Sequence, residues 1–83
     1  MMPKNTYPLW ERRARCYLAR TLYRQLGSYD KAAVAMKRSR ERVRQLVDMA
    51  DRTDRAIEAG RPVSRPSSYD IYRAYKNILK EHP

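Results

Sequence analysis

The residues best suited to chemistry lie between positions 38 and 45, where the chain reads Arg-Ser-Arg-Glu-Arg-Val-Arg-Gln. In a helix that begins at Arg40, Arg44 lies one turn further along the same face, with Glu41 and Gln45 beside them. Arginine suits the O6 and N7 edge of guanine, glutamine suits the N6 and N7 edge of adenine, and glutamate accepts from cytosine N4. We therefore expect Arg40, Glu41, Arg44 and Gln45 to contact base edges of double-stranded DNA.

Glu41 is the informative residue of this segment. A helix that only gripped phosphates would gain nothing from a carboxylate among Arg38, Arg40, Arg42 and Arg44. Its presence favours base reading, or a role in orienting the neighbouring guanidinium groups. The alternative is an ordinary charged helix start, in which Glu41 interacts with the positive end of the helix dipole.

The surrounding pattern predicts the elements that must position these side chains. Apolar residues recur at helical spacing over residues 9–26, 29–36 and 40–59, and no alternation typical of a strand appears. Gly27 and Gly60 stand where the first and third of these helices would stop. A long helix, a short helix, a three-residue turn and a capped helix form a helix-turn-helix arrangement.

The internal spacing fits this arrangement. Ala33 supplies the small residue needed where the two helices cross, and the apolar Met36 precedes the turn. Ser39 is the candidate N-cap of the second helix, and Val43 and Leu46 then turn inward four and seven positions later.

Two residues depart from the usual pattern of the turn. The turn often contains glycine, which tolerates left-handed backbone geometry, but this chain has Lys37. The position before the cap is commonly apolar, and here it is Arg38.

The segment Ser39-Arg40-Glu41-Arg42-Val43-Arg44-Gln45-Leu46 resembles the recognition helix of bacterial housekeeping sigma factors. That family reads Thr/Ser-Arg-Glu-Arg-Ile/Val-Arg-Gln-Ile in the promoter-binding helix-turn-helix of its region four. In the family, the first Arg and Glu and the later Arg and Gln face DNA. The resemblance therefore implies a similar presentation of Arg40, Glu41, Arg44 and Gln45 to the major groove.

The whole chain is predicted to be a single all-α domain of four helices with the helix-turn-helix at its centre. Residues 1–8 form an N-terminal arm, and residues 9–60 form the basic helix-turn-helix core. Residues 61–67 form a loop with two prolines. Residues 68–83 form a C-terminal helix for packing or dimerisation.

Charge points to the class of partner. The 83 residues carry a net charge of +10, and 14 of the 19 basic residues are arginine. Such a balance indicates a polyanionic partner, of which nucleic acid is the commonest. Residues 1–47 hold most of this charge, whereas residues 48–60 are net acidic. We expect the acidic stretch to point away from phosphates.

Several function classes are excluded by what the sequence lacks. Cys16 is the single cysteine and His82 the single histidine, so neither a disulfide framework nor a common zinc site can be assembled. With no glycine-rich phosphate loop, no membrane-length apolar stretch and no signal-peptide core, we expect a protein that is not an enzyme, binds no cofactor or metal and has no membrane partner.

Further contacts are expected outside the base-reading face. The residues expected to touch DNA phosphates are Ser28, Lys31, Lys37, Arg38, Ser39, Arg42, Arg12 and Arg13. The arginines of the first helix, which also include Arg15, Arg20 and Arg24, are expected mainly on a solvated face. The residues expected to pack the last helix or to join a homodimer are Ile71, Tyr75, Ile78 and Leu79.

Three functions compete. The leading hypothesis is a sequence-specific regulator of transcription of the small phage or mobile-element type, a homodimer bound to DNA in the cytoplasm of a bacterial cell or infected host. The alternative is a small basic protein-binding modulator or inhibitor of host RNA polymerase, or of another nucleic-acid machine. The third is a nonspecific nucleic-acid packaging protein.

Overall fold

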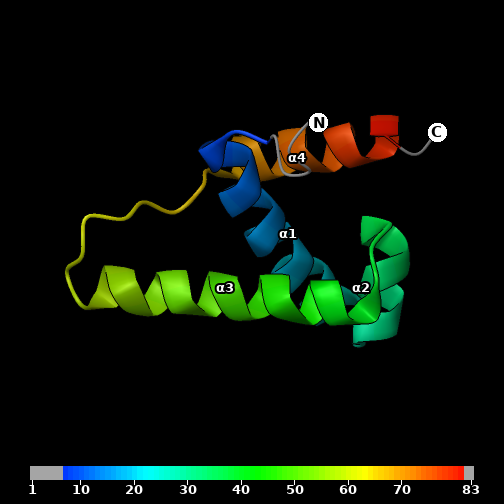
Figure 1. Cartoon of the computed structure of the whole chain (residues 1–83), viewed down its shortest axis with the longest axis horizontal. Coiled ribbons are helices and arrows are strands. Elements are labelled where there is room, and N and C mark those ends of the chain that lie inside the picture. Colours follow the sequence, from blue (N-terminus) through cyan, green and yellow to red (C-terminus); the bar gives the residue numbers. More distant parts are fainter. Residues whose placement is uncertain (1–6, 82–83) are drawn as a thin grey trace, which may run out of the picture.

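The computed structural model describes residues 7–81, which form four helices (Figure 1). They are α1 (Leu9–Leu26), α2 (Tyr29–Met36), α3 (Arg40–Glu58) and α4 (Ser68–Glu81). This confirms the predicted all-α, four-helix domain, and α3 ends one residue before the predicted Ala59. Most of the expected N-terminal arm and the last two positions of the expected C-terminal helix lie outside the described residues.

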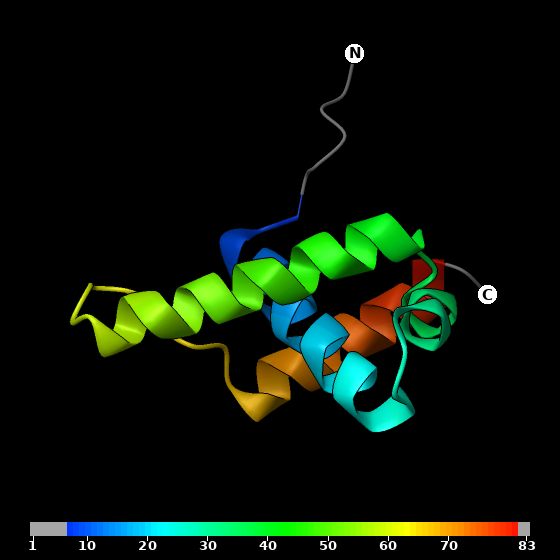
Figure 2. The same ribbon diagram turned by 90° about the horizontal axis from the view of Figure 1, so that it is seen from below.

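Helix α1 is the centre of the domain and packs against each of the other three helices. Helices α3 and α4 lie on opposite sides of α1 (Figures 1 and 2). Helix α2 packs on α1 and on the first part of α3, close to the turn that joins the two. The helix that carries the candidate base-reading residues is therefore positioned by α1 and α2 together.

The core lies where α1, α2 and α3 meet, and α4 closes one side of it. Met36, Val43 and Ile78 are the largest side chains with almost no exposed surface. Ala33 is buried as expected at the crossing of α2 and α3. Trp10 is half-buried at the start of α1, where the Arg73 guanidinium lies 4.1 Å from the centre of its ring.

The apolar stripe of α4 is used within the chain. Ile78 is completely buried, and Ile71 and Tyr75 pack against the core cluster. Leu79 is the member of the expected set that stays exposed, together with Tyr69 and Tyr72. Three of the four residues that were expected either to pack or to dimerise are therefore packed inside the chain. A homodimer would have to use the other face of α4.

The helix ends follow local chemistry. Gly27 closes α1 with φ of 81°, a left-handed conformation that glycine adopts without steric cost. The Ser28 hydroxyl accepts a hydrogen bond from the Lys31 amide (3.1 Å) at the start of α2. The Ser67 hydroxyl accepts one from the Asp70 amide (3.1 Å) at the start of α4. Serine is a preferred residue at the N-cap of a helix, because its hydroxyl accepts from an otherwise unpaired amide of the first turn.

Candidate nucleic-acid interface

The turn between α2 and α3 has the left-handed backbone that usually calls for glycine. Lys37 adopts φ of 58° and ψ of 40°, and is the one residue other than glycine with positive φ among residues 7–81. Its amide donates to the Val34 carbonyl (3.3 Å), and the next amide, of Arg38, donates to the Ala33 carbonyl (3.1 Å). These bonds satisfy carbonyl groups at the end of α2, so the turn keeps its geometry without glycine.

Arg38 takes the place of the apolar residue expected before the cap. Its guanidinium donates to the Tyr7 hydroxyl (3.2 Å) and lies 3.7 Å from a carboxylate oxygen of Glu81. The side chain is half-buried and links the turn to the end of α4. A polar contact to another element therefore does the positioning that an apolar contact would do elsewhere.

Ser39 begins α3, and its hydroxyl accepts a hydrogen bond from the Arg42 amide (3.1 Å). One side of the helix is then buried against α1 and α2, as expected for Val43 and Leu46 and also for Val47 and Ala50. The opposite side of α3 is exposed to solvent from the first turn of the helix.

The four expected base-contacting residues lie together on this solvent face. The side chains of Arg40 and Arg44 are 69% and 59% exposed, and Glu41 and Gln45 are also exposed. The structure thus brings together every residue of the predicted set on the first two turns of α3, with no apolar side chain among them.

Glu41 holds Arg44 through two hydrogen bonds. Arg44 donates from Nη2 to Oε2 (2.7 Å) and from Nε to Oε1 (3.2 Å) of Glu41. The hydrogen bonds and charge of Arg44 lower the pKa of the Glu41 carboxyl, which is ionised at neutral pH. Arg40 lies 3.6 Å from Asp30 of α2, again with both side chains exposed. Such exposed pairs contribute little to stability and can be exchanged for contacts to a ligand.

The residues expected to contact phosphates lie in three parts of the structure. Ser28 and Lys31 lie at the start of α2, and Lys37, Arg38 and Ser39 form the turn. The remaining three lie elsewhere: Arg12, Arg13 and Arg42 line a groove between α1 and α3. The hydroxyls of both serines serve as helix caps.

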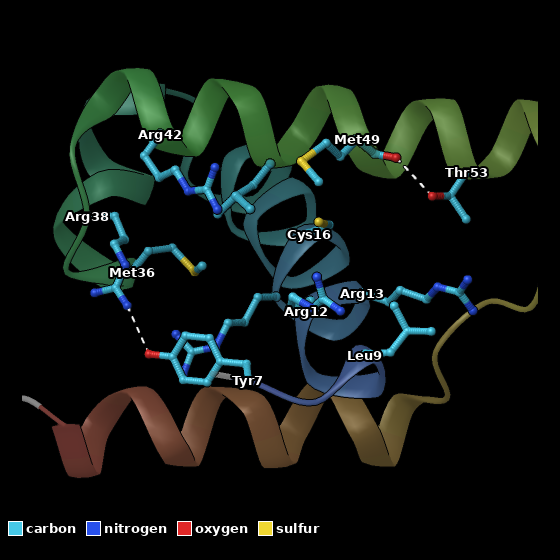
Figure 3. A pocket seen from close by; sticks show the side chains of 12 residues that line it. Tyr7, Leu9, Arg12, Arg13, Cys16, Met36, Arg38, Arg42, Met49 and Thr53 are labelled. Atoms are coloured by element: carbon cyan, nitrogen blue, oxygen red, sulfur yellow. Dashed lines mark hydrogen bonds between the residues drawn. The ribbon is translucent and has the colours of Figure 1, made fainter. Parts of the chain in front are cut away.

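This groove has a volume of about 280 Å³ (Figure 3). Its floor is apolar and consists of Leu9, Cys16, Met36, Leu46 and Met49. Its rim is basic and consists of Arg12, Arg13, Arg38 and Arg42. We call it the arginine-rimmed groove. No sequence pattern indicated it, because its walls come from two segments, residues 7–16 and 36–53, that are distant along the chain.

The solvated face predicted for the arginines of α1 is wrong for Arg15 and Arg20. Arg15 is buried, donating to Glu11 one turn earlier and to Glu81 at the end of α4, both at 2.9 Å. Asn77 of α4 also donates to Glu11 (3.3 Å). This cluster fastens α4 to α1, so the guanidinium is compensated inside the fold.

Arg20 is the centre of a second cluster, which joins α1 to the acidic half of α3. Its Nη1 donates to Asp51 (2.9 Å) and Asp54 (2.6 Å), and its side chain is only 12% exposed. Tyr17 and Arg65 also donate to Asp54, at 2.6 and 2.9 Å. Two of the five acidic residues of α3 are therefore used to hold the helix.

Sequence reasoning gave no role to Tyr7, Glu81 or Asp54. The i,i+4 spacing of Glu11 and Arg15 was the one local signal of the first cluster. Every other bond in the two clusters joins residues more than ten positions apart.

Comparisons with protein families, with curated proteins and with solved structures found no match. None of the helices within residues 7–81 is both long and apolar enough to cross a membrane.

Proposed function

We propose that this chain is a sequence-specific DNA-binding regulator of transcription that places the start of α3 in the major groove. The observation that carries the proposal is the common exposure of Arg40, Glu41, Arg44 and Gln45 on the first two turns of α3. A recognition helix uses its N-terminal residues to contact base edges, and these four side-chain types match the edges of three different bases.

The arrangement of charge supports the same reading. Within residues 7–81 the ion-pair partners of Arg40 and Arg44 are exposed carboxylates, so bases or phosphates can replace those partners at small cost. The exposed Lys31 and Lys37 lie on α2 and on the turn, where they can reach the DNA backbone. The net charge of +10 favours association with a polyanion.

The proposal includes a homodimer on an inverted repeat, because one recognition helix reads only part of a typical operator. It places the protein on DNA in the cytoplasm of a bacterial cell or infected host.

The test begins with selection of bound sites from random duplex DNA. Affinity for the selected site is then measured for the wild type, Arg44→Ala and Arg40→Ala. Each substitution should cost about 1–3 kcal/mol and relax preference at one base pair. Arg24→Ala, an exposed arginine at the far end of α1, is the matched control and should leave the preference unchanged.

Two results would contradict the proposal. The selection could return no preferred sequence, which would indicate nonspecific binding. Alternatively, Arg44→Ala could keep full specific affinity with its helical content intact, which would remove the recognition helix from the site.

A further inference from the structure

The arginine-rimmed groove combines two features that a DNA backbone does not need together. Its floor is open to solvent, because Leu9 and Met49 are 52% and 43% exposed. Cys16, Met36 and Leu46 continue this apolar surface inward. Phosphate groups gain no binding energy from an apolar floor. An apolar side chain bound there would bury its own surface and that of the floor away from water.

The rim selects the charge of the occupant. Arg12, Arg13 and Arg42 form no ion pair with a carboxylate of residues 7–81. No acidic residue lines the groove. In Figure 3, Arg38 and Arg42 lie toward one end of the groove and Arg13 extends toward the other, with the sulfur atoms of Met49 and Cys16 between them. The groove is thus an apolar surface on whose rim Arg12, Arg13 and Arg42 have no carboxylate partner among the described residues.

We propose that this groove binds an acidic amphipathic segment of a partner protein. One or two apolar side chains of that segment would occupy the floor, and its carboxylates would pair with Arg12, Arg13 and Arg42. A volume of about 280 Å³ lies just below the range of about 300–1,000 Å³ for small-molecule sites and suits side-chain anchors. Methionines adapt to anchors of different shape, and an amphipathic helix in a groove is a common mode of peptide recognition.

Two other occupants match the charge poorly. Residues 1–6 of this chain contain one lysine and no acidic residue. A second copy of the chain carries the same net charge of +10. The positive rim attracts an acidic partner, which favours its binding and also raises its rate of association.

The groove is distinct from the base-reading face but adjoins it. Arg42 belongs to the first turns of α3, one residue from Glu41 and two from Arg40 and Arg44. An acidic partner in the groove would therefore compete with any phosphate contact made by Arg42. The inference does not rest on DNA binding, because the floor and the rim are present in the free chain.

The probe is a fluorescein-labelled synthetic helix with leucines on one face and glutamates flanking them. Fluorescence anisotropy measures its affinity for the full chain. Replacing every glutamate of the probe by glutamine, or every leucine by serine, should weaken binding about tenfold or more. Equal binding of the three peptides would overturn the proposal.

Matched variants locate the binding. Arg12→Glu should weaken binding of the acidic probe about tenfold. The control Arg24→Glu makes the same change of charge on an exposed site of α1 outside the groove and should change affinity by less than about twofold. Equal loss in both variants would show a general effect of net charge and would refute a specific groove.

The methionines give an independent readout. In a spectrum of methyl-labelled methionine, the probe should shift the signals of Met36 and Met49, both of which line the groove. Binding that leaves these signals in place would refute the site. If a 20-base-pair duplex shifts them at about micromolar concentration while the acidic peptide does not, the groove serves DNA instead and the proposal fails.

Discussion

The cluster around Asp54 makes a large part of the stability of this domain depend on one carboxylate. Asp54→Asn keeps the shape of the side chain and removes its charge. Arg20, which is nearly buried, would retain Asp51 alone, and the Tyr17 hydroxyl would donate to a neutral acceptor. Arg65 is more than half exposed and contributes little.

The expected loss follows from these contacts. Hydrogen bonds to charged groups contribute about 1.5–3 kcal/mol each, and the amide retains part of that value. The substitution should therefore lower the free energy of unfolding by about 2–3 kcal/mol. A domain of this length has a total of roughly 4–12 kcal/mol, and the melting temperature should fall by roughly 10–20 °C.

The assay is urea and thermal unfolding followed by circular dichroism at neutral pH. Asp48→Asn is the matched control on the same helix, because Asp48 forms only an exposed i,i+4 pair with Arg52. The control should cost about 0.5 kcal/mol or less. If the two variants unfold at the same urea concentration, Asp54 does not hold α3 to α1 and the reasoning is wrong.

The pH dependence of the stability of the same variant gives a second test of this contribution. Although burial favours the neutral acid, hydrogen bonds from Tyr17, Arg65 and Arg20 hold the pKa of Asp54 well below its ordinary value of 3.8. Its contribution is therefore present above pH 3.8 and is lost as pH falls below that value. The gap in stability between the wild type and Asp54→Asn should stay constant down to about pH 5 and narrow below about pH 4.

Tyr17 titrates in the opposite sense. Burial and its hydrogen bond to Asp54 raise the pKa of the Tyr17 phenol from 10.0 to about 12. Its contribution is complete below pH 10.0 and is lost as pH rises toward 12. Relative to Tyr17→Phe, the wild type should lose stability in that interval.

Three further predictions concern the turn, the thiol and the oligomeric state. Lys37→Gly should raise the free energy of unfolding by about 1 kcal/mol in urea unfolding, because the left-handed backbone is strained for lysine; no gain would contradict the turn geometry. Burial raises the pKa of the Cys16 thiol, so a thiol reagent at neutral pH should react slowly with the native chain and rapidly in urea, and equal rates would show that Cys16 is accessible. The proposed homodimer would use the exposed face of α4. Sedimentation should then give twice the chain mass of 9.9 kDa for the wild type and the mass of a single chain for Leu79→Asp. The mass of a single chain for both proteins would contradict the homodimer.

Local pattern was enough to predict the helices and the common exposure of Arg40, Glu41, Arg44 and Gln45 on α3. The apolar stripes, the glycine stop at Gly27 and the serine caps act within a few residues, and they place Arg40 and Arg44 on the solvent side of α3 without reference to the rest of the chain. The packing of α4 on α1 was predicted only as one of two alternatives, because an apolar stripe does not say which surface covers it.

The two polar clusters could not be predicted in the same way. Arg15 and Arg20 lie on the same helix as the exposed Arg12 and Arg24, and they are buried where they meet carboxylates that are distant in sequence, Glu81 for Arg15 and Asp54 for Arg20. The arginine-rimmed groove was also beyond local pattern, since it exists only after α1 and α3 have packed. Burial of a charge requires a partner in three dimensions.

The arginines discussed above therefore fall into two groups, those that are buried in ion pairs at the two sides of α1 and those that are exposed. On the side of α1 that faces the acidic half of α3, Arg20 is fixed by two aspartates, and toward α4 Arg15 is fixed by two glutamates. Removing either from its partners would leave a buried charge, so neither is available to a ligand. Arg40 and Arg44 have exposed partners that they can exchange at little cost, and Arg12 and Arg42 have no carboxylate partner within residues 7–81. The pairs of Arg20 fix the direction in which α3 points, and under the proposed function this rigidity would present Arg40 and Arg44 to DNA in one orientation.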